Sequence, residues 1–192
     1  MKRGLTILLA ALVLLGCACA EEATVPAEEE AAYVPVEGAF SVTMALPEGY
    51  ICAADFADST TYVALVCCPG DPGKPVLYLS VIYDANDAYA SIDAMPEAEV
   101  RDWITTLRNQ YMAEYGSVNV RITAAENGKS ALVVTGAPGG KPLAEIYYLV
   151  SGYQVQAHVT AVDGEGAETA LTEEQLAGVL AILSGMNITA AE

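Results

Sequence analysis

The chain has 192 residues and carries 25 Asp and Glu against 8 Lys and Arg, a formal net charge of −17. Two of the basic residues, Lys2 and Arg3, lie in an N-terminal targeting segment, so the remaining chain carries a net charge of −19. Such a charge repels phosphate backbones and anionic lipid, and we expect no binding to nucleic acid or directly to an anionic membrane surface. An apolar share of 54% excludes a wholly disordered chain. About 170 residues follow the targeting segment, enough for one domain.

Residues 1–20 are typical of a bacterial signal peptide, with a basic start and an apolar run too short to span a bilayer. Two processing sites fit. Residues 14–17, Leu-Leu-Gly-Cys, resemble a lipobox, in which the thiol of Cys17 receives a diacylglycerol and becomes the lipid anchor. Residues 18–20, Ala-Cys-Ala, also fit ordinary cleavage after Ala20, which would release a secreted protein. Both predict an extracytoplasmic location, lipid-anchored at the cell membrane or secreted.

Residues 21–38 predict an acidic flexible tether. The segment is rich in Glu, Ala and Pro and has no apolar period, so it cannot contribute a buried face. A flexible chain of this length spans on the order of 23 Å root-mean-square. We expect a single globular domain at residues 39–189, held clear of its anchor.

The first half of this domain predicts strands followed by one long helix. Residues 40–46 alternate apolar and polar side chains, as a half-buried strand does. Residues 62–68 and 76–83 are β-rich runs that a Pro- and Gly-rich turn joins into a hairpin. From 93 to 115 the apolar period becomes three and four residues, which predicts a helix with Asp93 as its N-cap and a glycine as its stop. The apolar face of this helix consists of Val100, Trp103, Ile104, Leu107, Tyr111 and Tyr115.

The second half predicts four strands and a second helix. The strands are expected at residues 118–124, 130–135, 143–150 and 153–162. Asn-Gly and Ser-Gly pairs between them mark tight hairpin turns. Thr172 and Gln175 form a capping box, and Leu171 and Leu176 a hydrophobic staple, at the start of the last helix. Gly185 is its expected end.

This order of elements predicts an α+β fold, an antiparallel β-sheet with two main helices packed on it. Residues 46–50, Leu-Pro-Glu-Gly-Tyr, follow the first strand, and residues 147–153, Tyr-Tyr-Leu-Val-Ser-Gly-Tyr, form a hairpin. In element order and in these motifs, most of the domain resembles the PsbP-like superfamily of α/β/α sandwiches, which includes extrinsic photosystem subunits, Ran-binding relatives and many bacterial lipoproteins. The resemblance implies a fold used for binding and assembly, without a shared catalytic centre.

His158 is the only histidine, so any Ser-His-Asp triad would have to use it. It lies in the expected strand 153–162, where Gln154, Gln156, His158 and Thr160 share one face. No Gly-x-Ser-x-Gly motif presents a serine nucleophile. We therefore expect no catalytic residue, interpret His158 as a solvated strand histidine, and take this polar row as the candidate ligand-binding face.

No cofactor or metal site is predicted. A single histidine excludes His-pair metal motifs. Residues 136–142 contain Gly-Lys but lack the first glycine, the hydroxyl and the following helix of a phosphate-binding loop. Residues 84–87, with Asp93, lack the glycine and the final acid of a calcium loop. Residues 163–168 are interpreted as an acidic connection.

The domain contains three cysteines, Cys52, Cys67 and Cys68. An odd number in an exported protein leaves at least one thiol unpaired. The sequence leaves open whether Cys52 forms a disulfide with Cys67 or with Cys68. Three thiols without a histidine partner do not favour a structural zinc site.

The sequence as a whole predicts a non-catalytic binding or assembly domain of a bacterial cell envelope, exported and membrane-tethered. The expected partner is an envelope protein or a glycan. Tyrosines on strands favour a recognition surface, although sheet packing explains most of them; they are Tyr78, Tyr83, Tyr147, Tyr148 and Tyr153. Two alternatives remain: a small-ligand or cation-binding envelope protein, and an extracytoplasmic hydrolase that would use His158.

Overall fold

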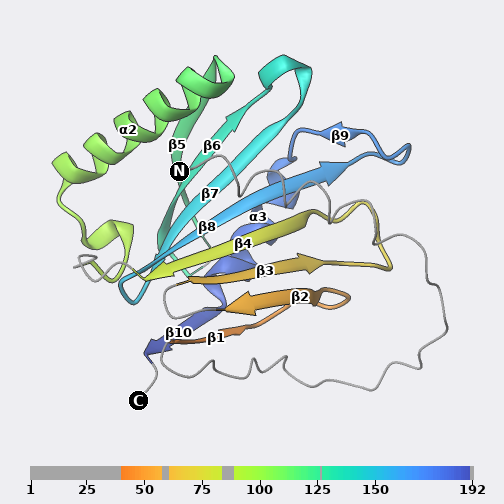
Figure 1. The fold of residues 1–192 in the computed structure, drawn as a ribbon, viewed down its shortest axis with the longest axis horizontal. Coiled ribbons are helices and arrows are strands. Elements are labelled where there is room, and N and C mark those ends of the chain that lie inside the picture. Colours follow the sequence, from red (N-terminus) through yellow and green to blue (C-terminus); the bar gives the residue numbers. More distant parts are fainter. Residues whose placement is uncertain (1–39, 58–60, 84–88, 126, 191–192) are drawn as a thin grey trace.

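Most of the domain forms one antiparallel sheet, in whose strands successive side chains point to opposite faces. The computed structural model describes residues 40–57, 61–83, 89–125 and 127–190. In spatial order the strands of the main sheet are β2 (Ile51–Ala57), β3 (Thr61–Cys67), β4 (Val76–Tyr83), β8 (Tyr153–Val162), β7 (Leu143–Val150), β6 (Ser130–Gly136) and β5 (Val118–Ala124), and the short β9 (Glu168–Thr169) pairs with β8 (Figure 1).

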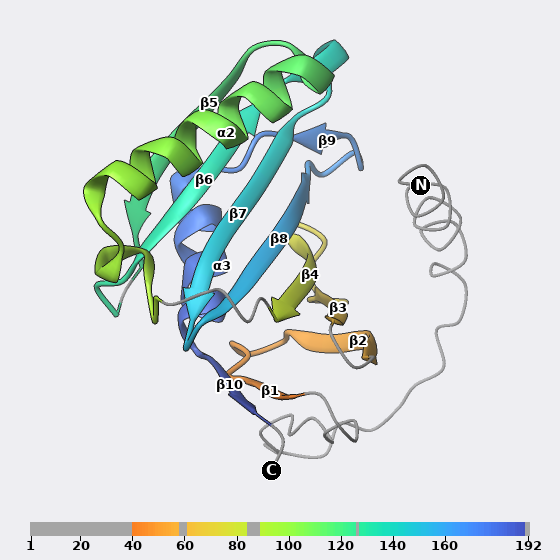
Figure 2. The same ribbon diagram turned by 60° about the vertical axis from the view of Figure 1, so that its left-hand side comes forward.

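Two helices cover opposite faces of this sheet. Helix α2 (Glu97–Tyr115) lies on one face and α3 (Glu173–Ser184) on the other, which makes the sheet the middle layer (Figure 2). Strand β7 is buried along its whole length, since its alternate side chains belong to the core beneath α2 and the core beneath α3. The predicted α+β class is confirmed. Within the described ranges, neither helix is long and apolar enough to cross a membrane.

Helix α2 begins later than the sequence predicts. Asp93 lies in a separate 3-10 turn, η1 (Ile92–Ala94), and Pro96 occupies the N-cap position. The Asp93 carboxylate accepts hydrogen bonds from the amide (2.8 Å) and the hydroxyl of Ser130. The prediction that Asp93 caps the helix is therefore wrong, because its partner lies 37 residues away, beyond the reach of a local capping rule. Gly116 ends the helix with a φ of +82°, as predicted.

Helix α3 has the capping box, the C-terminal glycine and the apolar stripe that the sequence predicts. The Gln175 amide donates to the Thr172 hydroxyl (3.1 Å), and the Thr172 amide donates to the Gln175 side-chain carbonyl (2.9 Å). This reciprocal pair satisfies two amides that the first turn of a helix leaves without partners. Gly185 is the C-cap. The predicted apolar stripe is buried against the sheet and consists of Leu176, Val179, Leu180 and Leu183.

The other predicted strands are confirmed to within two residues at each end, but three strands were not predicted. Strand β2 is an edge strand with both faces largely exposed, so it has no apolar alternation. The two-residue β9 is too short to show a pattern. Strand β10 (Met186–Ala190) pairs with β1 (Phe40–Met44) in a separate ribbon, which joins the two ends of the domain beside α3 (Figure 2).

We expect Thr172→Ala to lower the free energy of unfolding by about 1 kcal/mol, because it removes the side-chain acceptor of the capping box. Urea unfolding followed by circular dichroism measures this change. Thr106→Ala, at an exposed position inside α2, is the matched control and should leave the stability unchanged or slightly raised. Equal losses in the two variants would contradict the role of the cap.

Candidate functional site

Helix α2 covers only part of its sheet face. Its core is shared with β5, β6 and β7, whereas the same side of β8, β4, β3 and β2 is turned towards solvent (Figure 1). Cross-strand partners point to the same side of a sheet, so the strand registers define this surface, which we call the open face. It consists of Ile51, Ala54 and Phe56 on β2; Thr61, Val63, Leu65 and Cys67 on β3; Val76, Tyr78, Ser80 and Ile82 on β4; and Gln154, Gln156, His158 and Thr160 on β8.

The predicted polar row is part of this open face. Burial alternates along the whole of β8, and the half-buried positions include Gln154, Gln156, His158 and Thr160. The strand prediction and the shared face are confirmed. The structure brings Gln156 and His158 together through a third residue, Glu145 on β7, which the sequence analysis did not single out.

Glu145 is a buried carboxylate with only 8% of its surface exposed. It lies opposite His158 across β7 and β8, at the margin of α2. Its Oε1 is 2.7 Å from His158 Nδ1, and its Oε2 accepts a hydrogen bond of 3.2 Å from Gln156 Nε2. A buried carboxylate without partners is strongly destabilising, so these two contacts are what make the position tolerable.

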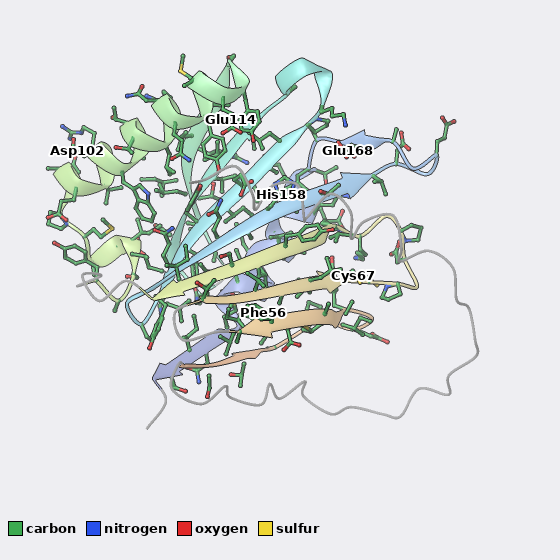
Figure 3. The ribbon with its side chains drawn as sticks, in the orientation of Figure 1. Phe56, Cys67, Asp102, Glu114, His158 and Glu168 are labelled. Carbon is green, nitrogen blue, oxygen red and sulfur yellow. The ribbon has the colours of Figure 1, made fainter. Side chains whose placement is uncertain are left out.

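His158 lies on the predicted strand and is partly exposed to solvent, but it has a charged partner that the sequence did not predict. Its side chain is 45% exposed, and its hydrogen bond to Glu145 raises the pKa above the ordinary 6.5, against the opposing effect of burial. Engagement of Nδ1 holds the ring in one orientation and leaves Nε2 without a hydrogen-bond partner among the described residues. The site thus presents one orientated imidazole on β8 (Figure 3), the first strand of the open face beyond α2, and the open face carries no Asp, Glu, Lys or Arg.

Two tyrosine hydroxyls lie beneath α2 next to this pair. The hydroxyls of Tyr111 on α2 and Tyr147 on β7 are 2.8 Å apart in a buried environment. Burial raises the pKa of Tyr147 to about 12 and that of Tyr111 further, and the nearby Glu145 charge acts in the same direction. Both phenols are neutral at physiological pH. Trp103 on α2 meets the Tyr147 ring of β7 edge-on at 6.0 Å, so an aromatic contact holds α2 against β7. Within α2, Tyr115 stacks on Tyr111 at 5.8 Å.

The outer strands of the open face are apolar. Phe56 is 62% exposed, Ile51 46%, Ile82 39% and Val63 38%. Phe56 lies directly opposite Val63 across β2 and β3. The Tyr78 ring lies between this apolar part and β8, with its centroid 6.3 Å from that of the His158 ring. The open face therefore changes from ordered and polar on β8 to exposed and apolar on β2 and β3.

The remaining tyrosines and the cysteines belong mainly to packing. Tyr148 and Tyr153 are buried in the core beneath α3, whereas the Tyr83 side chain lies outside the described residues. The three cysteines of the domain are free. Cys67 is on the open face. Cys52 lies opposite Val66, a buried residue of β3, and packs against the core beneath α3. The two thiols therefore point to opposite sides of the sheet.

The other candidate segments from the sequence add no further binding site among the described residues. Residues 84–87 and the N-terminal segments with Cys17 lie outside the described residues. In the 163–168 connection, Asp163 Oδ1 accepts hydrogen bonds of 2.9 Å from the amides of Glu165 and Ala167, which orders the turn. The part of the chain that the structure describes holds no cluster of three potential metal ligands.

A cavity of about 290 Å³ lies on the other side of the sheet, where β5 to β8 meet the start of α3. Arg121 and Glu173 both line it and form an ion pair of 2.9 Å with each other. The guanidinium is thus already neutralised by a carboxylate of the same cavity. Glu168 also lines the cavity, so the cavity offers no net positive charge to an anionic ligand. We therefore take the open face as the stronger site.

Comparison of the chain with protein-family models and with curated proteins finds no match. The interpretation of the site therefore rests on its own geometry. A histidine orientated by a carboxylate is one half of a general-base arrangement. Ser80 lies opposite Gln156, diagonally from His158. Within the described residues, however, no serine hydroxyl hydrogen-bonds to His158.

We expect the stability of the protein to depend on pH through His158. The folded-state pKa of His158 is raised, so the contribution of its contact with Glu145 is fully present below pH 6.5 and is lost as the pH rises through the raised value. Urea unfolding from about pH 5.5 to about pH 8.5 should show this decline in the wild type, and His158→Gln should remove it.

Glu145→Gln provides the matched control for the cause of the shift. Without the Glu145 carboxylate, burial lowers the imidazole pKa against only the weaker effect of the Glu168 charge, and we expect the pKa to fall to the ordinary value or below it. An NMR titration of the imidazole protons measures this directly. An unchanged His158 titration in Glu145→Gln would show that another group controls the ring.

Proposed function

We propose that this protein is a non-catalytic binding or assembly domain of a bacterial cell envelope, with the open face as its contact surface. The observation that carries the proposal is the composition of that face: exposed apolar side chains beside an ordered polar strip, with no Asp, Glu, Lys or Arg, in a chain that has 25 acidic residues. Interface centres are depleted in charged residues and enriched in aromatic ones. A solvated surface of a strongly acidic protein would have carried carboxylates.

The exposed side chains also favour binding by their size. Phe56, Ile51, Val63 and Ile82 are exposed on neighbouring strands of one face of the sheet. Each buried large apolar side chain contributes about 1.5–3 kcal/mol relative to its exposed state. Their grouping on one surface supports a partner that covers them, since scattered single exposed residues need no such explanation.

Export and a lipid anchor at Cys17 complete the proposal. They rest on the signal and lipobox pattern of residues 1–20, followed by the acidic tether at 21–38. The antiparallel sheet between two helices supports the further proposal that the domain is a PsbP-like α/β/α sandwich. In that arrangement the tether would hold the open face away from the membrane, within reach of an envelope protein or glycan.

An extracytoplasmic hydrolase is the second candidate, because one observation favours it. Glu145 orientates His158 at a partly exposed position, as the acid of a catalytic triad does. The candidate lacks a hydroxyl bonded to the imidazole within the described residues. Turnover of an ester or peptide substrate that His158→Ala abolishes and Phe56→Ser leaves intact would favour the hydrolase over the binding domain.

We expect Cys17→Ser to release the protein from the membrane fraction, because serine cannot form the thioether to diacylglycerol. Fractionation of cells that express each form, with mass spectrometry of the mature N-terminus, measures the change. Cys19→Ser is the matched control and should remain membrane-bound. A wild-type protein that begins at Glu21 without lipid would instead identify the secreted form.

We expect a photo-crosslinking amino acid at Val63, on the open face, to give a discrete adduct in intact envelopes, and one at Met112, on the outer side of α2, to give none. Adding Phe56→Ser should reduce the adduct from position 63, because Phe56 is its cross-strand neighbour. Equal adducts from both positions, or none from position 63, would contradict the open face as the contact surface.

A further inference from the structure

We infer that the open face binds a partner protein whose contact surface has an apolar centre and a basic rim. The inference rests on the proposed function and names the kind of partner. It follows from how charge is distributed around the open face. The centre carries no Asp, Glu, Lys or Arg, and the margin is rich in carboxylates.

The centre sets the first requirement. His158 and its buried partner Glu145 form an ion pair when the imidazole is protonated, and in that state they present no net charge to an incoming surface. The exposed side chains further out, on β2, β3 and β4, are aromatic or aliphatic, with Phe56 and Val63 as a cross-strand pair. A charged group of the partner placed here would lose its hydration without gaining a counter-ion. The centre of the partner must therefore be uncharged and apolar.

The margin sets the second requirement. The β3–β4 turn, the end of α2 and the β8–β9 connection surround one end of the open face, and Figure 3 shows Glu114 and Glu168 beyond His158 on the side away from Phe56. The exposed charged residues of these three segments are the carboxylates Asp71, Glu114, Asp163, Glu165 and Glu168 and the ammonium of Lys74. This end of the margin is therefore negative, and it favours Lys or Arg on the partner.

The acidic margin is also ordered. The amides of Ala167 and Glu165 both donate to Asp163 Oδ1 at 2.9 Å, which fixes the turn that carries Glu165 and leads into Glu168. These hydrogen bonds lower the pKa of Asp163. The Glu168 charge reaches His158, where it adds to the effect of Glu145 in raising the imidazole pKa.

Other occupants fit less well. A second copy of the mature chain would bring two net charges of −19 together, and the acidic margins would repel each other. An anionic membrane is repelled for the same reason. A glycan could use Tyr78 and the glutamine side chains, but its hydroxyl groups would leave the aliphatic side chains of Ile51, Val63 and Ile82 poorly covered. A protein surface supplies both the apolar area and the basic rim.

The test uses two synthetic peptides of about 12 residues, in which Val and Phe alternate with Lys in one and with Glu in the other. Binding to the full-length mature protein is measured by calorimetry at about 0.15 M salt, with the fluorescence of the single Trp103 as a second readout. We expect the Lys peptide to bind at least about tenfold more tightly than the Glu peptide.

Three variants locate the binding. Phe56→Ser should weaken the Lys peptide about three- to tenfold through loss of apolar contact. The double variant Glu165→Gln, Glu168→Gln should weaken it and make its affinity less dependent on salt. Met112→Ser, which removes an exposed apolar side chain from the outer side of α2, should have no effect. Phe56 and Met112 are both at least half exposed, so folding should be preserved in both variants, as circular dichroism would verify.

Each contrary result has its own meaning. If the Glu peptide binds as tightly as the Lys peptide, and Phe56→Ser weakens both, the open face is a contact surface but its partner is not basic. If the Lys peptide binds and Phe56→Ser has no effect, the binding is general attraction to an acidic protein, and the inference is overturned. If neither peptide binds and position 63 gives no crosslink in envelopes, the inference and the proposed function both fail.

Discussion

The partial cover that α2 gives to its sheet face is the constraint on which the rest of the site depends. The helix packs on β5, β6 and β7 and ends its contacts there, so one half of the face is core and the other half is surface. Glu145 lies at the boundary. It is buried because α2 covers β7, yet its two hydrogen-bond partners, Gln156 and His158, belong to β8, the first strand beyond the helix. The free-energy cost of burying the Glu145 carboxylate on β7 is offset by its hydrogen bonds to two side chains of β8, and these bonds hold the two side chains in place.

That order gives the surface its character. His158 is held by one ring nitrogen, the Gln156 amide is engaged with the same carboxylate, and Tyr78 lies beside the imidazole. A side chain already held in one rotamer loses less conformational entropy when a partner binds it. The apolar strands further out are exposed and unconstrained by such bonds. A polar strip of fixed geometry beside apolar area suits recognition better than turnover, which would need a nucleophile in contact with the imidazole.

The parts of this site differ in how far the sequence could predict them. The period of two in 153–162 placed Gln154, Gln156, His158 and Thr160 on one face, because strand geometry alone decides that. Glu145 stands in an apolar run, Leu-Ala-Glu-Ile-Tyr-Tyr, and that single acid was the one available signal of a buried charge. Its partners could not be read from the sequence, since they depend on the register between β7 and β8. Asp93 shows the same limit: its capping position was plausible locally, but Ser130 offered the better partner.

By itself, the sequence determined the strands with alternating faces, the two helices, the capping box of Thr172 and Gln175 and the excess of negative charge. These depend on residues a few positions apart, where backbone geometry fixes which side chains meet. Only the tertiary structure decided the order of the strands, the pairing of β1 with β10, the extent of α2 over the sheet and the contact of Glu145 with His158. Those features depend on which segments pack together, and many packings satisfy the same local pattern. The open face exists because the helix that shields β5 to β7 has no counterpart over β2 to β4 within the described residues.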